Sequence, residues 1–254
     1  MKVQRFSRIV GGLRVGGDFF ERAGLAAAGA PPRGLVGRVE ELAGRDVDVR
    51  AFPDEVRAFF EDPASLELRI RSRWRGGFRL AWRVMRVAMR AIGQLVLPVD
   101  VASVRARMVS LDGAKEGRPD ARGVVRTREE TGEVFQVFAY GVSVIEGEPR
   151  MSVAIPLPGG HIAGLLRLSM EGSAVTLGTR PRAAGDPSGV WFVTPWWSLR
   201  LPLEETLRFW RARDPAAPVA ASDRGWPDAS FVAVHEQRLW GALVVEHTYA
   251  FRPR

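Results

Sequence analysis

Cysteine is absent from this sequence of 254 residues, which excludes disulfide bonds, thiolate nucleophiles and cysteine-ligated metal centres. Histidine is scarce, with three positions, His161, His235 and His247. The pair His235-Glu236 begins like the His-Glu-x-x-His motif of zinc proteases, but Leu239 stands where the second histidine is required. The Gly-x-Ser-x-Gly motif of hydrolases is missing too. The sequence therefore predicts no metal, no cofactor and no recognised catalytic centre.

Long apolar runs are missing as well. No stretch of about 18 uncharged apolar residues is present, so no segment is expected to span a bilayer. Near the N-terminus, Arg14 and Asp18 interrupt the apolar stretch that a signal peptide needs. We therefore expect a cytoplasmic protein, with peripheral contact at the inner face of the membrane as the alternative.

Lysine is nearly absent from a chain that is strongly basic. Lys2 and Lys115 are the lysines among 37 basic residues, and the formal net charge is +8. A basic chain favours anionic partners such as phosphate, nucleic acid or an acidic membrane surface. The preference for arginine over lysine is also typical of GC-rich bacterial genomes, so the charge by itself selects none of these partners.

Apolar residues make up 46% of the chain, which is enough for one large domain with a substantial core. Residues 1–50 are a leader that is punctuated by Gly11-Gly12, Gly16-Gly17 and Gly29-Ala30-Pro31-Pro32. This leader lacks the Lys-Ser/Thr pair of a phosphate-binding loop. We expect it to pack loosely, or to dock only through Phe19-Phe20, on a single domain formed by residues 51–254.

The pattern of the body predicts an α+β fold. A short helix follows Pro53, and the alternation of Leu66–Trp74 is typical of a half-buried strand. A helix is predicted over Pro202–Ala212, where Leu203, Leu207 and Trp210 share one face. The other predicted strands are Val104–Leu111, Gly123–Arg128, Val134–Ile145, Met151–Leu157, Ile162–Met170, Ala174–Thr179, Val190–Pro195, Phe231–Leu239 and Ala242–Phe251. Short turns between them indicate an antiparallel meander of about eight to ten strands, open or curled into a barrel, packed on one long helix.

That long helix is predicted between Gly76 and Pro98. Four arginines follow one another at helical spacing, within a strip roughly 60° wide, and every other position from Phe78 to Ile92 is apolar. The pattern favours a core helix under the sheet with a narrow polar seam. Contact with an anionic membrane surface, or with phosphate or nucleic acid, remains as an alternative role for the stripe. The four residues are Arg79, Arg83, Arg86 and Arg90.

A resemblance can be stated on these residues. The segment Pro53 to Glu61 with its Phe59-Phe60 pair, the following strand, the basic apolar helix that ends in Leu97-Pro98, and the β-rich remainder resemble an uncharacterised family of bacterial proteins. The resemblance covers roughly residues 50–254. It implies no activity, cofactor or partner.

The leading hypothesis is a non-enzymatic protein that binds a hydrophobic or lipid-like molecule, at the membrane face or away from it. Tryptophan walls are typical of apolar ligand cavities. The candidate ligand-binding residues are Trp82, Trp191, Trp196 and Trp197. Nucleic acid is not favoured, because the basic and the aromatic stretches are separate along the chain.

Two alternatives of other classes stay open. If Trp240-Gly241 is a two-residue turn, His235 lies opposite Glu246 and His247 lies on the other face of the sheet, so His235 and Glu246 are candidates for an acid–base pair of an enzyme. The third hypothesis is a structural or protein-interaction module that associates through an exposed sheet edge. His161 is expected to lie exposed beside a hairpin turn.

Overall fold

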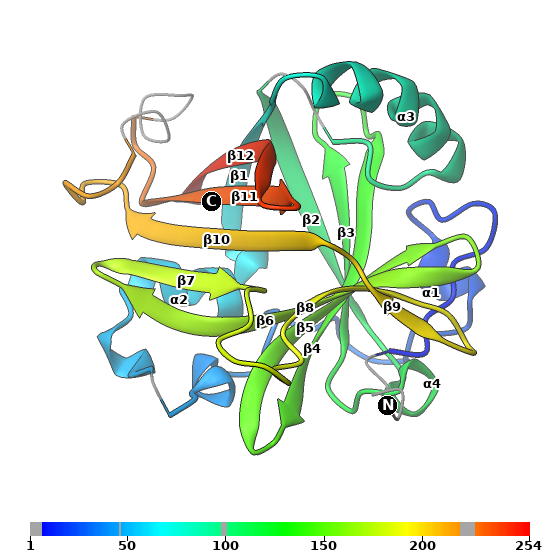
Figure 1. Cartoon of the computed structure of the whole chain (residues 1–254), viewed down its shortest axis with the longest axis horizontal. Helices are drawn as coiled ribbons and strands as arrows, with labels where there is room; N and C mark the ends of the chain where they lie inside the picture. Colours follow the sequence, from blue (N-terminus) through cyan, green and yellow to red (C-terminus); the bar gives the residue numbers. More distant parts are fainter. Residues whose placement is uncertain (1–6, 46, 98–100, 219–226) are drawn as a thin grey trace.

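Ten antiparallel strands form a closed barrel in the computed structural model, which describes residues 7–45, 47–97, 101–218 and 227–254 (Figure 1). The strand order is β5-β4-β3-β2-β1-β12-β11-β10-β7-β6, and pairing of β6 with β5 closes the ring. The barrel strands are β1 (Leu66–Trp74), β2 (Ala102–Ser110), β3 (Arg122–Arg128), β4 (Val134–Ile145), β5 (Glu148–Leu157), β6 (Gly160–Glu171), β7 (Ala174–Gly178), β10 (Leu203–Arg211), β11 (Phe231–Leu239) and β12 (Ala242–Pro253). Two further strands, β8 (Gly189–Val193) and β9 (Ser198–Arg200), extend the sheet outward from β6.

The predicted antiparallel sheet is thus confirmed, with one wrong element. Residues predicted as the helix Pro202–Ala212 form β10, which pairs with β11 from Leu203 opposite Leu239 to Arg211 opposite Phe231. The error has a physical cause, because a spacing of four residues between apolar side chains fits a helix face and also fits one face of a strand. Trp210, which seemed to complete the helical face, lies on the outer side of the barrel in a separate cluster with Val232.

One end of the barrel is closed by α2 (Asp54–Glu61), the helix predicted after Pro53. Its Phe59 ring lies 4.7 Å from the ring of Phe209 on β10, and Phe231 stacks on Phe251 at 4.3 Å beneath it. Buried aromatic side chains of this kind each contribute about 1.5–3 kcal/mol through lost contact with water. The phenylalanine layer therefore makes this end of the barrel a packed core.

The N-terminal segment packs firmly against the outside of the barrel, so the expected loose packing is wrong. Phe20 is fully buried, and a Cβ atom on Gly123 of β3 would lie 2.7 Å from its ring. Only glycine therefore allows this close approach. Ile9, Val15 and Phe19 are buried in the same cluster. The short helices of this segment and of later turns are α1 (Phe19–Arg22), η1 (Val39–Leu42), η2 (Val49–Ala51), η3 (Pro63–Ser65) and α4 (Gly113–Glu116).

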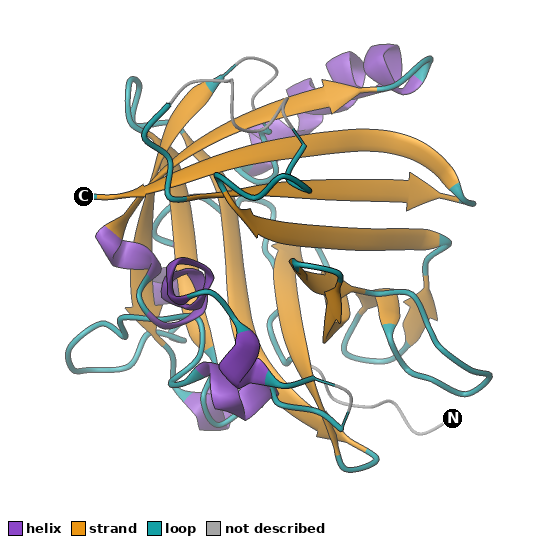
Figure 2. Cartoon of the chain, turned by 90° about the vertical axis from the view of Figure 1, so that its left-hand side faces the viewer, coloured by secondary structure: helices purple, strands orange, loops and turns teal. Residues whose placement is uncertain are grey.

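The long helix α3 (Phe78–Ile92) lies at the opposite end of the barrel from the C-terminus (Figure 2). It ends at Gly93, which adopts the left-handed conformation (φ 69°) that favours glycine at this position; the predicted stop at Pro98 lies outside the described residues. Gln94 then donates to the carbonyl of Val137 on β4 at 2.7 Å, which anchors the end of the helix to the barrel.

The expectation that the sheet packs on this helix as a core element is wrong. Trp82 is the one buried side chain of α3. Its ring stacks on that of Trp74 of β1, with ring centroids 4.4 Å apart. Leu80, Val84 and Val87 point outward and are 67%, 70% and 72% exposed. None of the described helices is long and apolar enough to cross a membrane.

Candidate functional site: the barrel cavity

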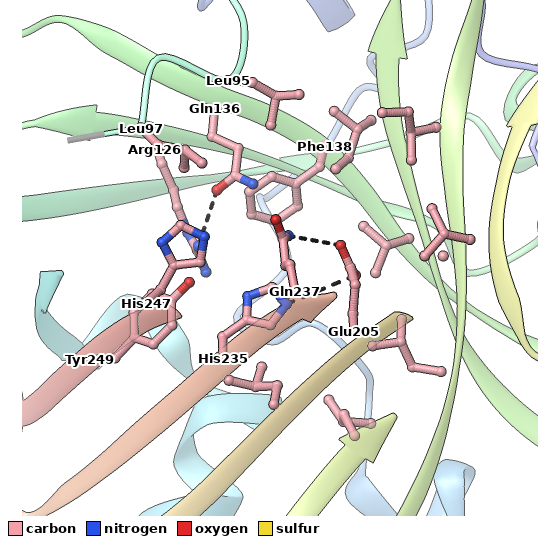
Figure 3. A pocket seen from close by; sticks show the side chains of 18 of the residues that line it. Leu95, Leu97, Arg126, Gln136, Phe138, Glu205, His235, Gln237, His247 and Tyr249 are labelled. Atoms are coloured by element: carbon pink, nitrogen blue, oxygen red, sulfur yellow. Dashed lines mark hydrogen bonds and ion pairs between the residues drawn. The ribbon is translucent and has the colours of Figure 1, made fainter. Parts of the chain in front are cut away.

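A cavity of about 240 Å³ lies inside the barrel (Figure 3). The volume is close to the lower end of ligand pockets, which measure roughly 300–1,000 Å³. Met85 and Met89 of α3 line the cavity on one side together with Trp82. Most of the remaining lining is apolar, from strands all around the ring, for example Ile155, Ile162, Leu203 and Leu207.

Polar side chains from two sets of strands point into the cavity (Figure 3). One set comes from β3 and β4, and the other comes from β10, β11 and β12. On β10 and β11, Gln237 Nε2 donates to Glu205 Oε1 at 2.8 Å, and His235 Nε2 lies 3.9 Å from Glu205 Oε2. His247 of β12 is joined through Nδ1 to the Ser72 hydroxyl of β1 at 2.8 Å. A cavity that is mainly apolar thus contains a small, ordered set of polar groups, as ligand-binding cavities commonly do.

The two histidines share the interior face, contrary to the predicted pairing. A β-bulge between Gln237 and Arg238 shifts the register of the β11–β12 hairpin by one residue. His235 therefore lies opposite His247, with ring centroids 5.5 Å apart. Glu246 lies on the outer face, where its carboxylate contacts Arg75 at 3.4 Å. The predicted His235–Glu246 pair does not exist.

Burial controls the protonation of these groups. It raises the pKa of Glu205 to about 7, with the hydrogen bond from Gln237 acting in the opposite direction. Burial lowers the pKa of His235 to about 4 and that of His247 well below its usual value. Both imidazoles are therefore neutral near pH 7, and Glu205 can release or accept a proton in that range.

Arg126 of β3 is the cationic side chain of this wall. Its Nη1 donates to Gln136 Oε1 on β4 at 3.2 Å, and its guanidinium lies 4.9 Å from the centre of the Phe138 ring. Its Nε atom is buried without a hydrogen-bond partner. In the part of the chain that the structure describes, no carboxylate forms an ion pair with Arg126.

The four candidate tryptophans lie in different parts of the structure. Trp82 lines the cavity, as a ligand-binding role requires. Trp191 is buried outside the barrel with Ile145 and Leu165. Trp196 and Trp197, in the turn between β8 and β9, are 81% and 48% exposed. The last three do not line the cavity.

The four arginines of the α3 stripe differ in exposure and in their contacts. Arg79 and Arg83 are exposed, and Arg86 is half-buried beside Trp82 on the barrel side of the helix. Arg90 contacts Glu133 at 3.2 Å. The stripe therefore borders the face that rests on the barrel, and the exposed apolar residues lie on the far side from it.

His161 is a structural residue. It is 2% exposed, and its Nδ1 lies 2.8 Å from the carbonyl oxygen of Ile9. Its expected exposure is wrong, because the N-terminal segment covers the β5–β6 turn. Burial lowers its pKa to about 4.

Sequence reasoning missed Glu205, Arg126 and Gln237. A signal for Glu205 existed, because it stands at the two-residue spacing that places Leu203, Leu207 and Phe209 on one face of a strand, but the helix prediction hid this spacing. No three His, Cys, Asp or Glu side chains among the described residues group to hold a metal ion.

Comparison with known proteins adds a relative and no activity. No protein-family model and no solved structure matches the chain. The chain is similar to an uncharacterised bacterial protein. This relative, "Uncharacterized membrane protein YndJ" of Bacillus subtilis (strain 168), is 27% identical over 208 residues, which are 80% of this chain. The match spans 38% of the relative's length, and the resemblance inferred from the sequence is thereby confirmed.

Proposed function

We propose that this barrel binds a hydrophobic or lipid-like small molecule between its inner walls and α3. The observation that carries the proposal is the cavity of about 240 Å³, which is lined mainly by apolar side chains and bordered by Met85 and Met89. Methionine side chains are unbranched and adapt to ligands of different shape. Each methylene group that a ligand buries there contributes about 0.8 kcal/mol.

We extend the proposal to the place of binding, which is an anionic membrane surface at the α3 end of the barrel. Leu80, Val84 and Val87 form an exposed apolar face on α3, and the exposed Arg79 and Arg83 lie on the same helix beside this face. Interfacial helices combine an apolar face with basic residues, and each arginine contributes on the order of 1 kcal/mol near anionic lipid.

A further exposed apolar side chain supports an orientation with the α3 end of the barrel towards the membrane. Trp240, in the turn between β11 and β12, is 79% exposed. It lies at the same barrel end as α3, because Arg75, just before the helix, donates its backbone N–H to the carbonyl of Val244. The name of the relative, a membrane protein, agrees with contact at a membrane.

The alternative functions have less support. The acid–base enzyme was based on His235 and Glu246, which lie on opposite faces of the sheet. An interaction module needs a free sheet edge, but each of the ten barrel strands has a neighbour on both sides. The short strand β9 is left as the described edge.

Native mass spectrometry of the protein purified from a bacterial host tests the ligand. We expect a mass excess that dissociates as a small hydrophobic species. Gly164 lines the cavity in an ordinary strand conformation, so Gly164→Leu fills the cavity and is expected to abolish the excess mass. Gly178→Leu places the same side chain on β7 where the nearest atom is 3.8 Å away, and serves as the control. A bare polypeptide mass, together with no uptake of added 1-decanol, would refute ligand binding.

Flotation with vesicles tests the membrane contact. The variant Leu80→Ser/Val84→Ser/Val87→Ser is expected to lose binding to vesicles that contain phosphatidylglycerol, because it removes the exposed apolar face of α3. Val144→Ser is the control, since Val144 is 71% exposed on β4 near the opposite barrel end. Equal flotation of both variants and of the unaltered protein would contradict the proposed orientation.

A further inference from the structure

Arg126 is a half-buried cation that lines a mainly apolar cavity. A guanidinium group stays protonated at all physiological pH values. Taking it out of water is costly unless an anion or several acceptors compensate. Gln136 supplies one acceptor, the Phe138 ring a weak cation–π contact, and the buried Nε atom has no partner.

The carboxyl of Glu205 does not neutralise this cation. Both side chains line the same cavity, from β3 and β10, but they form no ion pair. A guanidinium in contact would lower the pKa of a carboxyl, whereas the pKa of Glu205 is raised to about 7 by burial. The positive charge of Arg126 is therefore left without a counter-charge from the described parts of the chain.

A second donor stands beside Arg126. The phenol of Tyr249 on β12 lines the same cavity as Arg126 (Figure 3). A guanidinium next to a phenol is a donor set that suits an oxyanion, because arginine binds carboxylate and phosphate through parallel N–H groups. The apolar remainder of the cavity suits the other part of such a molecule.

We infer that Arg126 binds the anionic end of an amphiphilic ligand, a single carboxylate or phosphate group carried on an apolar tail. The inference rests on the proposed function, since it names the class of molecule that the cavity takes. The tail lies along Ile155 and Ile162 and below Met85 and Met89 of α3. The ligand is thus a fatty-acid-like or alkyl-phosphate-like molecule and not a neutral lipid.

Isothermal titration with decanoate, decyl phosphate and 1-decanol tests this assignment on the full chain. These probes share one tail and differ in the head group. We expect the unaltered protein to bind at least one anionic probe about tenfold more tightly than 1-decanol, because charge-assisted hydrogen bonds are stronger than neutral ones. The decanoate and decyl phosphate arms show which anion is preferred.

The variant Arg126→Gln is expected to lose this preference, so that its affinities for the anionic probes and for 1-decanol differ by less than about twofold. Binding of 1-decanol by the variant also reports that it is folded. Arg126→Lys is expected to keep part of the preference, since it keeps the charge. Arg105→Gln is the control, because Arg105 lies on the outer face of the neighbouring strand β2 and contacts Glu129.

The outcomes separate the two proposals. Equal affinity of the unaltered protein for the charged and neutral probes, or an anion preference that survives in Arg126→Gln, overturns the assignment of Arg126 and leaves the hydrophobic cavity in place. Binding of none of the three probes overturns the assignment together with the proposed function.

Discussion

The buried carboxyl of Glu205 makes the stability of this protein depend on pH in a way that one substitution can isolate. Its pKa is about 7 in the folded protein and 4.5 for an ordinary glutamate. In the unfolded chain the carboxyl therefore ionises first. This group costs no stability below about pH 4.5, the cost grows between pH 4.5 and 7, and it is complete above pH 7.

The size of the effect follows from the two pKa values. A difference of one pKa unit corresponds to 1.36 kcal/mol, so the span from 4.5 to about 7 gives about 3 kcal/mol. The Glu205 side chain is 18% exposed, and water in the cavity screens its charge. We therefore expect about 2–3 kcal/mol.

Glu205→Gln removes the ionisation and keeps the hydrogen bond, because a glutamine Oε1 accepts from Gln237 as the carboxyl does. We expect the variant to exceed the unaltered protein in free energy of unfolding by about 2–3 kcal/mol at pH 8 and by less than about 1 kcal/mol at pH 5. His235, His247 and Arg126 also line the cavity, but they are present in both proteins and largely cancel in the difference.

Urea denaturation at several pH values, followed by tryptophan fluorescence, measures this difference. Glu204→Gln removes a carboxyl from the outward position next to Glu205 and is expected to show no comparable gain at pH 8. A gain for Glu205→Gln that is the same at pH 5 and pH 8 would refute the reasoning. It would mean that Glu205 ionises in the folded protein as easily as in the unfolded chain.

Three further predictions concern other parts of the fold. Trp82→Ala removes the stacking partner of Trp74 and is expected to cost about 3–5 kcal/mol of unfolding free energy in urea titrations; a cost below about 1 kcal/mol would show that α3 is not held by this contact. Gly123→Ala forces a methyl group to within 2.7 Å of the Phe20 ring and is expected to cost about 1–3 kcal/mol, whereas Gly12→Ala, with no atom within 4 Å, serves as its control in the same thermal unfolding assay. His161 has a pKa of about 4 against 6.5 unfolded, so stability is lost as pH falls from 6.5 towards 4; His161→Gln is expected to make this loss shallower, and an unchanged acid limb would contradict its burial as a neutral group.

The barrel itself was predictable from the sequence to a large extent. Strands such as Val134–Ile145 and Phe231–Leu239 are rich in apolar residues and are each followed by a short turn, and both have the predicted limits. Short turns impose antiparallel pairing on the strands that they join. The pairs β1–β12 and β7–β10, which join strands far apart in the sequence, could not be predicted in this way. Closure itself depends on strand tilt and stagger, which no local pattern records.

The candidate site was predictable only in part. Trp82 was found because its helix is strongly periodic, but the side on which that helix would be covered is decided by tertiary contacts. The His235–Glu246 pairing failed because a single bulge, which leaves Val244 without a partner on β11 and is marked by no glycine, shifts the pairing beyond it by one residue. Arg126 stands in a short strand where its neighbours Val125 and Thr127 gave no hint of an interior charge.

The place of β12 in the ring makes closure of the barrel depend on contacts between segments that are far apart in the sequence. This strand lies between β1 and β11, so Leu66 is paired with Pro253 across nearly the whole barrel sequence. Without β12 the other nine barrel strands leave a gap between β1 and β11. The apolar interior is then exposed to water until residues 242–253 pair with both strands. Closing so long a loop is slow, and open intermediates with unpaired edges are prone to associate. The barrel cavity is therefore complete only when β12 is paired with both β1 and β11.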